Sequence, residues 1–97
     1  MIRASTKLPC TFYFRPLEPV GKDTMRLIHG RVNRLFKALI ARHIIVERIT
    51  LTSDCHEWKV ITRQDKTLVI EDRLIVEHGE VEAAARVLSA HLVENSG

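Results

Sequence analysis

The strongest chemical signal in this sequence is a run of positive side chains with no acid among them. Between Asp23 and Glu47 the chain holds no other aspartate or glutamate. The cations of this run are Arg26, Arg31, Arg34, Lys37 and Arg42. Surface helices ordinarily intersperse acids with such cations, because like charges one turn apart repel each other. The uncompensated run therefore favours an anionic partner, and its excess of arginine favours bidentate contacts to phosphate or carboxylate groups.

Three interpretations of this cationic run stay open. The phosphates of a nucleic acid would supply the missing negative charge, and binding would then weaken steeply with salt. An acidic protein surface would satisfy the same geometry, and a solvated helix face would need no partner at all. We expect RNA or a ribosome to bind to the five cations of the run. The alternative is a small protein-interaction or inhibitor module, homodimeric and encoded on a mobile element, with no nucleic-acid role.

Metal and catalytic sites have little support in the sequence. Structural zinc sites show closely spaced pairs of cysteines or histidines, whereas Cys10 and Cys55 are far apart and the five histidines are scattered. The motifs of phosphate loops, nucleophile elbows and zinc proteases are absent. A small toxin-like ribonuclease would need Glu57, Asp72 or His78 to meet an arginine in a cleft. We therefore expect no catalytic residues, no metal and no cofactor.

Length and composition suit one small domain. The 97 residues are 45% hydrophobic and 28% charged, with a net charge of +3. Residues 1–46 hold nine Lys/Arg and two acids (9 − 2 = +7), whereas residues 47–97 hold six and ten (6 − 10 = −4). Neither a membrane span nor a secretory signal is recognisable, and two cysteines are too few for a disulfide scaffold. We expect a cytoplasmic protein with reduced thiols and an ordered core over about residues 10–94.

Residue periodicity predicts an α+β domain with the order β-α-β-β-β-α. A strand is expected over 10–15 and a helix over 24–41, capped by Asp23 or Thr24. The following strands are expected over 44–52, 58–63 and 67–77, and the last helix over 79–94. A mostly antiparallel sheet with two helices packed on one face would bury the apolar stripes. In the last helix this stripe is expected to be Val81, Ala84, Ala85, Leu88 and Leu92.

Two residues within these elements have more than one interpretation. Asp72 falls on the apolar face of the strand expected over 67–77. A bulge at 71–73 or a division into two short strands would turn it away, and a buried catalytic aspartate is the remaining alternative. Trp58, the only tryptophan, is expected in the core rather than on a surface where nucleic-acid bases stack.

The element order and one local stretch resemble the ribosome hibernation-promoting factors, also called the S30AE or protein Y family. Residues 76–85 (VEHGEVEAAA) look like the family's strand end, acidic turn and Ala-Ala helix start, and the pattern from RLF at 34–36 to ITL at 49–51 is also similar. The resemblance, over roughly residues 10–94, implies contacts from basic side chains to small-subunit ribosomal RNA. Only the first-helix cations carry over, because the family's second helix ends in a Lys-rich segment where residues 90–94 here are AHLVE. Glu82 and Arg86 are further departures, at positions where the family has Tyr and Asp.

Overall fold

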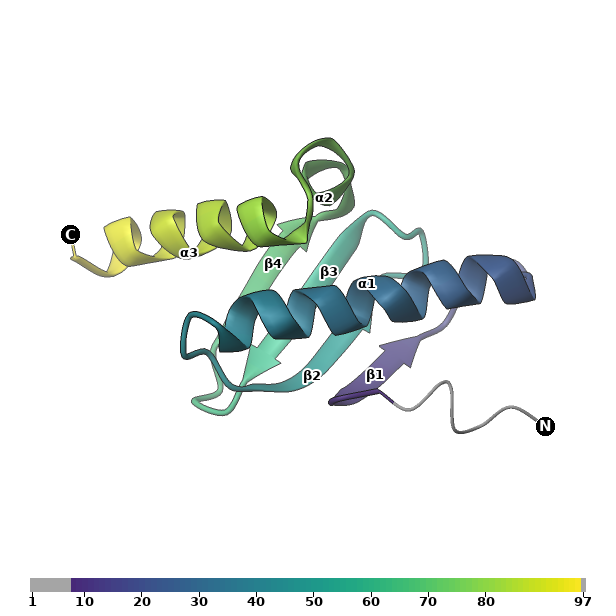
Figure 1. The fold of residues 1–97 in the computed structure, drawn as a ribbon, viewed down its shortest axis with the longest axis horizontal. Coiled ribbons are helices and arrows are strands. Elements are labelled where there is room, and N and C mark those ends of the chain that lie inside the picture. Colours follow the sequence, from purple (N-terminus) through teal and green to yellow (C-terminus); the bar gives the residue numbers. More distant parts are fainter. Residues whose placement is uncertain (1–7, 97) are drawn as a thin grey trace.

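The structure is a computed structural model that describes residues 8–96, and the side chains of residues 8–90. The elements follow in the order β1 (Thr11–Phe14), α1 (Lys22–Ile40), β2 (Val46–Leu51), β3 (Glu57–Thr62), β4 (Thr67–Glu71), α2 (Asp72–His78) and α3 (Glu80–Ser96). Figure 1 shows α1 lying across the sheet and α3 beside it. The expected α+β class is confirmed, but residues 8–96 form three helices rather than two. No helix within residues 8–96 has the length and apolar character needed to cross a bilayer.

The four strands form one sheet in the order β1-β2-β3-β4. β2 pairs antiparallel with β3, and β3 with β4, as expected for strands joined by short turns. β1 is parallel to β2, with Phe12 opposite Ile49, because α1 carries the chain back over the sheet between them. A register shift at Val46/Arg48 marks a bulge where β2 begins. The sheet is therefore mixed, with its only parallel pair at the β1 edge.

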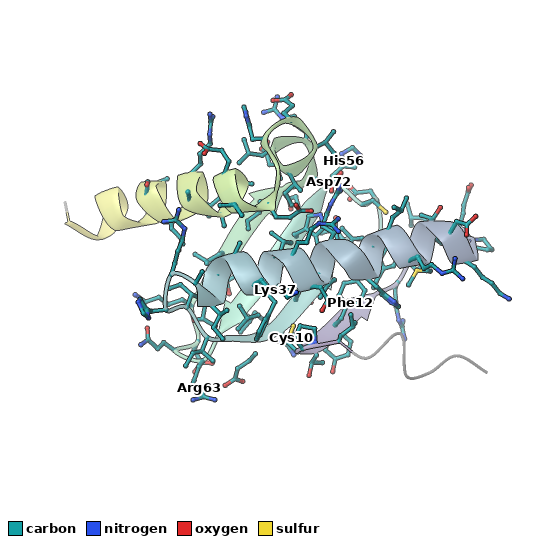
Figure 2. The ribbon with its side chains drawn as sticks, in the orientation of Figure 1. Cys10, Phe12, Lys37, His56, Arg63 and Asp72 are labelled. Carbon is teal, nitrogen blue, oxygen red and sulfur yellow. The ribbon has the colours of Figure 1, made fainter. Side chains whose placement is uncertain are left out.

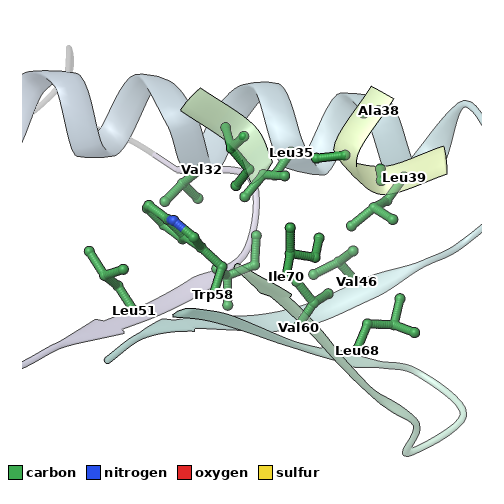
Figure 3. Packing of buried hydrophobic residues seen from close by; sticks show 14 of the residues in the cluster. Val32, Leu35, Ala38, Leu39, Val46, Leu51, Trp58, Val60, Leu68 and Ile70 are labelled. Carbon is green, nitrogen blue, oxygen red and sulfur yellow. The ribbon is translucent and has the colours of Figure 1, made fainter. Parts of the chain in front are cut away.

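The core lies between α1 and one face of the sheet (Figure 3). Val32, Leu35 and Leu39 recur at helical spacing along α1 and are fully buried. Each such side chain contributes about 1.5–3 kcal/mol when it is fully buried. Trp58 is only 1% exposed. Its ring stacks on that of Phe12, with 6.2 Å between the ring centroids. The expectation that the tryptophan belongs to the core is confirmed.

The strand expected over 67–77 is wrong in its second half. β4 ends at Glu71, and Asp72 opens the short helix α2. The Asp72 amide donates a 2.8 Å hydrogen bond to the carbonyl of His56, one step beyond the last β3–β4 pair. The Asp72 side chain accepts a hydrogen bond from Trp58, and the chain leaves the sheet there as α2, without a bulge or a second strand. Gly79 then ends α2 at a φ of 87°, in the left-handed region that glycine reaches at little cost.

Two details of the helices also differ from expectation. α1 begins at Lys22, with Gly21 as its N-cap residue and no side-chain cap. Asp23 lies instead in the first turn, where its charge favours the positive end of the helix dipole. In α3, Ala83 and Ala84 are buried, whereas Val81 is 64% exposed. Ala84 and the partly buried Leu88 confirm part of the expected stripe, whereas Ala83 takes the place expected for Val81. Leu92 lies outside the described side chains.

Candidate nucleic-acid interface

The structure divides the five cations expected to bind RNA into paired and unpaired groups. Arg31 and Arg34 form ion pairs with carboxylates from the second half of the chain. Arg26 pairs only with its neighbour Asp23, at 3.7 Å on the open surface. Within the described side chains, no carboxylate oxygen lies within 4 Å of the charged groups of Lys37 and Arg42. The cationic run is thus not one continuous surface.

The paired arginines belong to a polar cluster that we call the carboxylate clamp: Arg31, Arg34, Trp58, Asp72 and Glu80. Arg31 Nη1 donates a 2.8 Å hydrogen bond to Asp72 Oδ1, and the same oxygen accepts a 2.8 Å bond from Trp58 Nε1. Arg34 Nε donates to Glu80 Oε2 at 2.9 Å. Arg31 Nε lies 3.5 Å from that glutamate oxygen and is buried without a hydrogen bond. The clamp ties the helix α1 to the first residues of α2 and α3.

Local geometry explains why these groups meet. Arg31 and Arg34 are three residues apart, so their side chains leave α1 on the same side. Gly30 leaves space for the second of them, because a Cβ atom at position 30 would lie 3.0 Å from Arg34 Nη1. Asp72 and Glu80 are the first residues of α2 and α3, where negative charge is favourable. Glycine at position 30 lowers the stability of α1, but it leaves room for the close approach of the Arg34 side chain.

The electrostatics of the clamp show that its charges are already satisfied. Burial on its own would raise the pKa of the Glu80 carboxyl, but the hydrogen bond from Arg34, a backbone hydrogen bond and the charges of Arg34 and Arg31 outweigh it. The pKa of Glu80 is therefore lowered. The Arg31 side chain is 27% exposed and that of Arg34 is 55% exposed, and both are paired with carboxylates from other elements. The expected positive surface is therefore neutralised at these two positions, and their contact with RNA stays a prediction.

A second group of cations surrounds a hollow at the other end of the sheet, which we call the basic hollow. It has a volume of about 420 Å³ and lies between the turn after α1, the β3–β4 hairpin and α3. Its lining residues are Arg42, His43, Ile44, Ile45, Thr62, Arg63, Gln64, Lys66, Leu68 and Leu88. Figure 2 shows Arg63 at the hairpin end of the sheet and Asp72 beside α2 at the opposite end. The clamp and the hollow are thus separate sites.

Backbone hydrogen bonds fix the rim of the basic hollow. The His43 amide donates to the carbonyl of Ile40 at 2.9 Å, and the Arg63 amide donates to the carbonyl of Ile45 at 2.9 Å. The Lys66 amide donates to Thr62 Oγ1 at 3.2 Å. His43 adopts a φ of 66°, a left-handed conformation that reverses the chain directly after Arg42. The backbone that carries the cations is therefore held in place before any ligand binds.

Among the residues whose side chains the structure describes, no acid lines the basic hollow. Asp65 lies in the same hairpin turn but is exposed and is not among the lining residues. Among the side chains of residues 8–90, no carboxylate lies within 4 Å of the charged groups of Arg42, Arg63 or Lys66. The sequence analysis identified Arg42 but missed the two hairpin cations. The turn expected at residues 64–66 could have indicated them. Because β2 pairs antiparallel with β3, the turn after β3 lies beside the segment that follows α1.

A smaller hollow of about 270 Å³ lies beside the carboxylate clamp, and its lining includes Arg31, Arg34, Cys55, Trp58 and Asp72. Asp72 thus meets arginines in a hollow, as the ribonuclease alternative required, and its Oδ1 atom accepts hydrogen bonds from Arg31 and Trp58. His78 Nε2 instead lies 3.7 Å from Oε2 of the adjacent Glu77. Both cysteines are free, and burial raises the pKa of each thiol, with the charges of Asp72 and Asp54 adding to the effect at Cys55. In the described part of the chain, no three or more His, Cys, Asp or Glu residues are grouped to hold a metal ion.

Comparisons with known proteins were made by family model, by sequence and by structure. The chain matches no family model, no curated protein and no solved structure. The resemblance to hibernation-promoting factors therefore stays a prediction from the sequence, and function must be argued from the basic hollow itself.

Proposed function

We propose that this protein is a non-catalytic RNA-binding module that docks through the basic hollow. The observation that carries the proposal is the convergence of Arg42, Arg63 and Lys66 from two distant segments, with no acid among the lining residues of the described part of the chain. Natural surfaces ordinarily place opposite charges close together, as the carboxylate clamp does in the same molecule. Cations held apart from carboxylates on a fixed backbone are suited to bind phosphate oxygens.

The charge distribution supports RNA in preference to a small anion. Lys37 is exposed on α1 one turn before its end, and Arg48 and Lys59 are exposed on the sheet. Lys37 lies outside the hollow, so a long polyanion that binds at the hollow can extend to it while a single phosphate cannot. Lys59 lies on the sheet face turned away from the core, and Arg48 lies over the ring of the exposed Tyr13. Each neutralised phosphate makes affinity more dependent on salt. Ribosomal RNA, as the resemblance implies, is one polyanion of this kind.

Charge reversal at the hairpin tests the proposal. Binding of a fluorescently labelled RNA is measured by anisotropy at several salt concentrations for the wild type and for the double variant Arg63→Glu, Lys66→Glu. We expect affinity to fall by about tenfold or more at low salt, and the slope of log affinity against log salt to become shallower by roughly one to two.

A matched control separates position from net charge. The double variant Arg73→Glu, Arg86→Glu makes the same change in charge on α2 and α3, where both arginines are exposed. We expect its affinity to stay within about threefold of the wild type. Equal losses in the two double variants would contradict docking at the hollow. If the wild type binds no RNA at low salt and light scattering shows a tight dimer, the protein-interaction alternative replaces the proposal.

A further inference from the structure

The basic hollow is deeper than phosphate binding alone requires. Its volume of about 420 Å³ is in the range of pockets that enclose small organic ligands, roughly 300–1,000 Å³. Its lining includes the apolar side chains of Ile44, Leu68 and Leu88. Leu68 also belongs to the core and is 3% exposed. Phosphate groups gain nothing from an apolar floor, so the hollow has a second component that the proposed function leaves unused.

Polar and planar groups at the rim add a further element. Gln64 carries both a donor and an acceptor on its side-chain amide. The Thr62 oxygen accepts the amide of Lys66, which leaves its hydroxyl proton available to donate. The imidazole of His43 and the guanidinium groups of Arg42 and Arg63 are flat, and such groups stack on nucleic-acid bases. An apolar floor, planar cations and a few polar groups are what a nucleobase requires.

From these features we infer that the basic hollow receives one unpaired nucleotide, with its base on the apolar floor and its phosphates on the cations of the rim. The inference rests on the proposed function and specifies single-stranded RNA as the ligand. A duplex keeps its bases stacked and paired inside the helix, so it presents only phosphates and ribose to the rim. The base of an unpaired nucleotide can turn outward and enter the hollow.

The test compares two strands of equal charge. One is a labelled single-stranded RNA, and the other has the same length and the same phosphates but abasic positions in place of its bases. Anisotropy titrations at one low salt concentration give both affinities for the wild type. We expect the abasic strand to bind about tenfold more weakly, since contact with one base changes affinity by roughly five- to a hundredfold. A duplex of matched length should behave like the abasic strand.

Two variants locate the effect in the hollow. Leu88→Trp fills the space next to the floor from α3, and Ser89→Trp on the exposed neighbouring position is its control. Gln64→Ala changes an exposed turn residue and should leave folding intact. The preference is the ratio of the affinity for the intact strand to that for the abasic strand. We expect Leu88→Trp to reduce this ratio to about one, and Gln64→Ala to reduce it by roughly two- to fivefold. The control should keep the full preference.

The possible outcomes distinguish this inference from the proposed function. If both strands bind the wild type equally, the unpaired nucleotide is excluded while RNA docking through phosphates stands. If neither strand binds, both ideas fall. If Leu88→Trp unfolds the protein, as judged by circular dichroism, Gln64→Ala decides. A preference unchanged in Gln64→Ala would then overturn the inference.

Discussion

The middle of α1 and the turn that follows it carry the same kind of side chain in opposite surroundings. At the carboxylate clamp, Arg31 and Arg34 are paired with acids more than forty residues away in sequence. At the basic hollow, Arg42 is exposed, and no carboxylate of the described side chains lies within ion-pair distance. One uninterrupted cationic run in the sequence therefore meets two different environments. Part of it holds helices together, and part of it is not neutralised by any carboxylate of the described side chains.

Solvation explains the difference between the two regions. A half-buried guanidinium loses hydration, so it must regain hydrogen bonds from a carboxylate or destabilise the fold. Arg31 is in this situation, whereas an exposed arginine such as Arg42 stays hydrated and can remain unpaired at little cost. Charge at an exposed position is thus free to be placed for binding. Exposure separates Arg31 from the candidate RNA contacts, whereas Arg34, whose side chain is 55% exposed, differs from them by its pairing with Glu80.

The largest expected effect comes from removing the central acceptor of the clamp. Asp72→Ala leaves Trp58 Nε1 without its acceptor in the core and Arg31 without its closest carboxylate. We expect the free energy of unfolding in urea to fall by about 2–4 kcal/mol. The control Glu71→Ala removes an exposed partner of Arg73 and should change it by about 0.5 kcal/mol or less. A similar loss in both variants would show that the clamp adds little beyond a surface ion pair.

A smaller effect is expected from the same charge reversal at two positions one turn apart on α1. Arg34→Glu places a carboxylate beside Glu80 and should lower the free energy of unfolding by about 1–2 kcal/mol. Lys37→Glu should change it by about 0.5 kcal/mol or less, because no ion pair is lost among the described side chains. Neither residue lines the hollow, so RNA affinity should fall by about threefold or less in Arg34→Glu. Lys37→Glu should weaken binding more than that, but less than the hairpin double variant, because Lys37 is a proposed contact outside the hollow.

The outcome that would break this comparison is specific. A folded Arg34→Glu variant that loses as much RNA affinity as the hairpin double variant would show that the clamp opens to bind RNA. The cationic face of α1 would then be the interface that the sequence first suggested.

The smallest expected effect depends on pH. Because the pKa of Glu80 is lowered in the folded protein from its ordinary value of 4.5, its ionised form stabilises the fold above that pH. This contribution is lost as pH falls through the lowered value. Glu80→Gln should therefore be less stable than the wild type by about 1 kcal/mol at neutral pH. Urea unfolding at decreasing pH should show the difference shrink towards zero, and a constant difference would assign the effect to packing.

Local periodicity predicted the elements whose burial is repetitive and missed those fixed by distant contacts. The α1 stripe of Val32, Leu35 and Leu39 was predictable because it repeats with the helical period. α2 was missed because Leu74 and Val76 continue the alternation of β4, while the turn at Asp72 depends on hydrogen bonds to His56 and Trp58.

The candidate site was predicted only in part for the same reason. Arg42 was identified because it belongs to the acid-free run, but its companions Arg63 and Lys66 join it only through the pairing of β2 with β3. The pairing of Arg31 and Arg34 depends on where α2 and α3 begin relative to α1. The spacing of residues within the cationic run does not indicate where those helices begin. The pairing of these two arginines with carboxylates could therefore be recognised only from the tertiary structure.

The parallel pairing of β1 has a consequence for the order of assembly. β2, β3 and β4 are joined by short turns, so their contacts close small loops and can form early. β1 gains its partner only after α1 has crossed the sheet, which closes a much longer loop. We expect the three C-terminal strands and α1 to form first and β1 to dock on them afterwards. The strand that is synthesised first would then be the last to join the sheet and the first to exchange its amide protons with solvent.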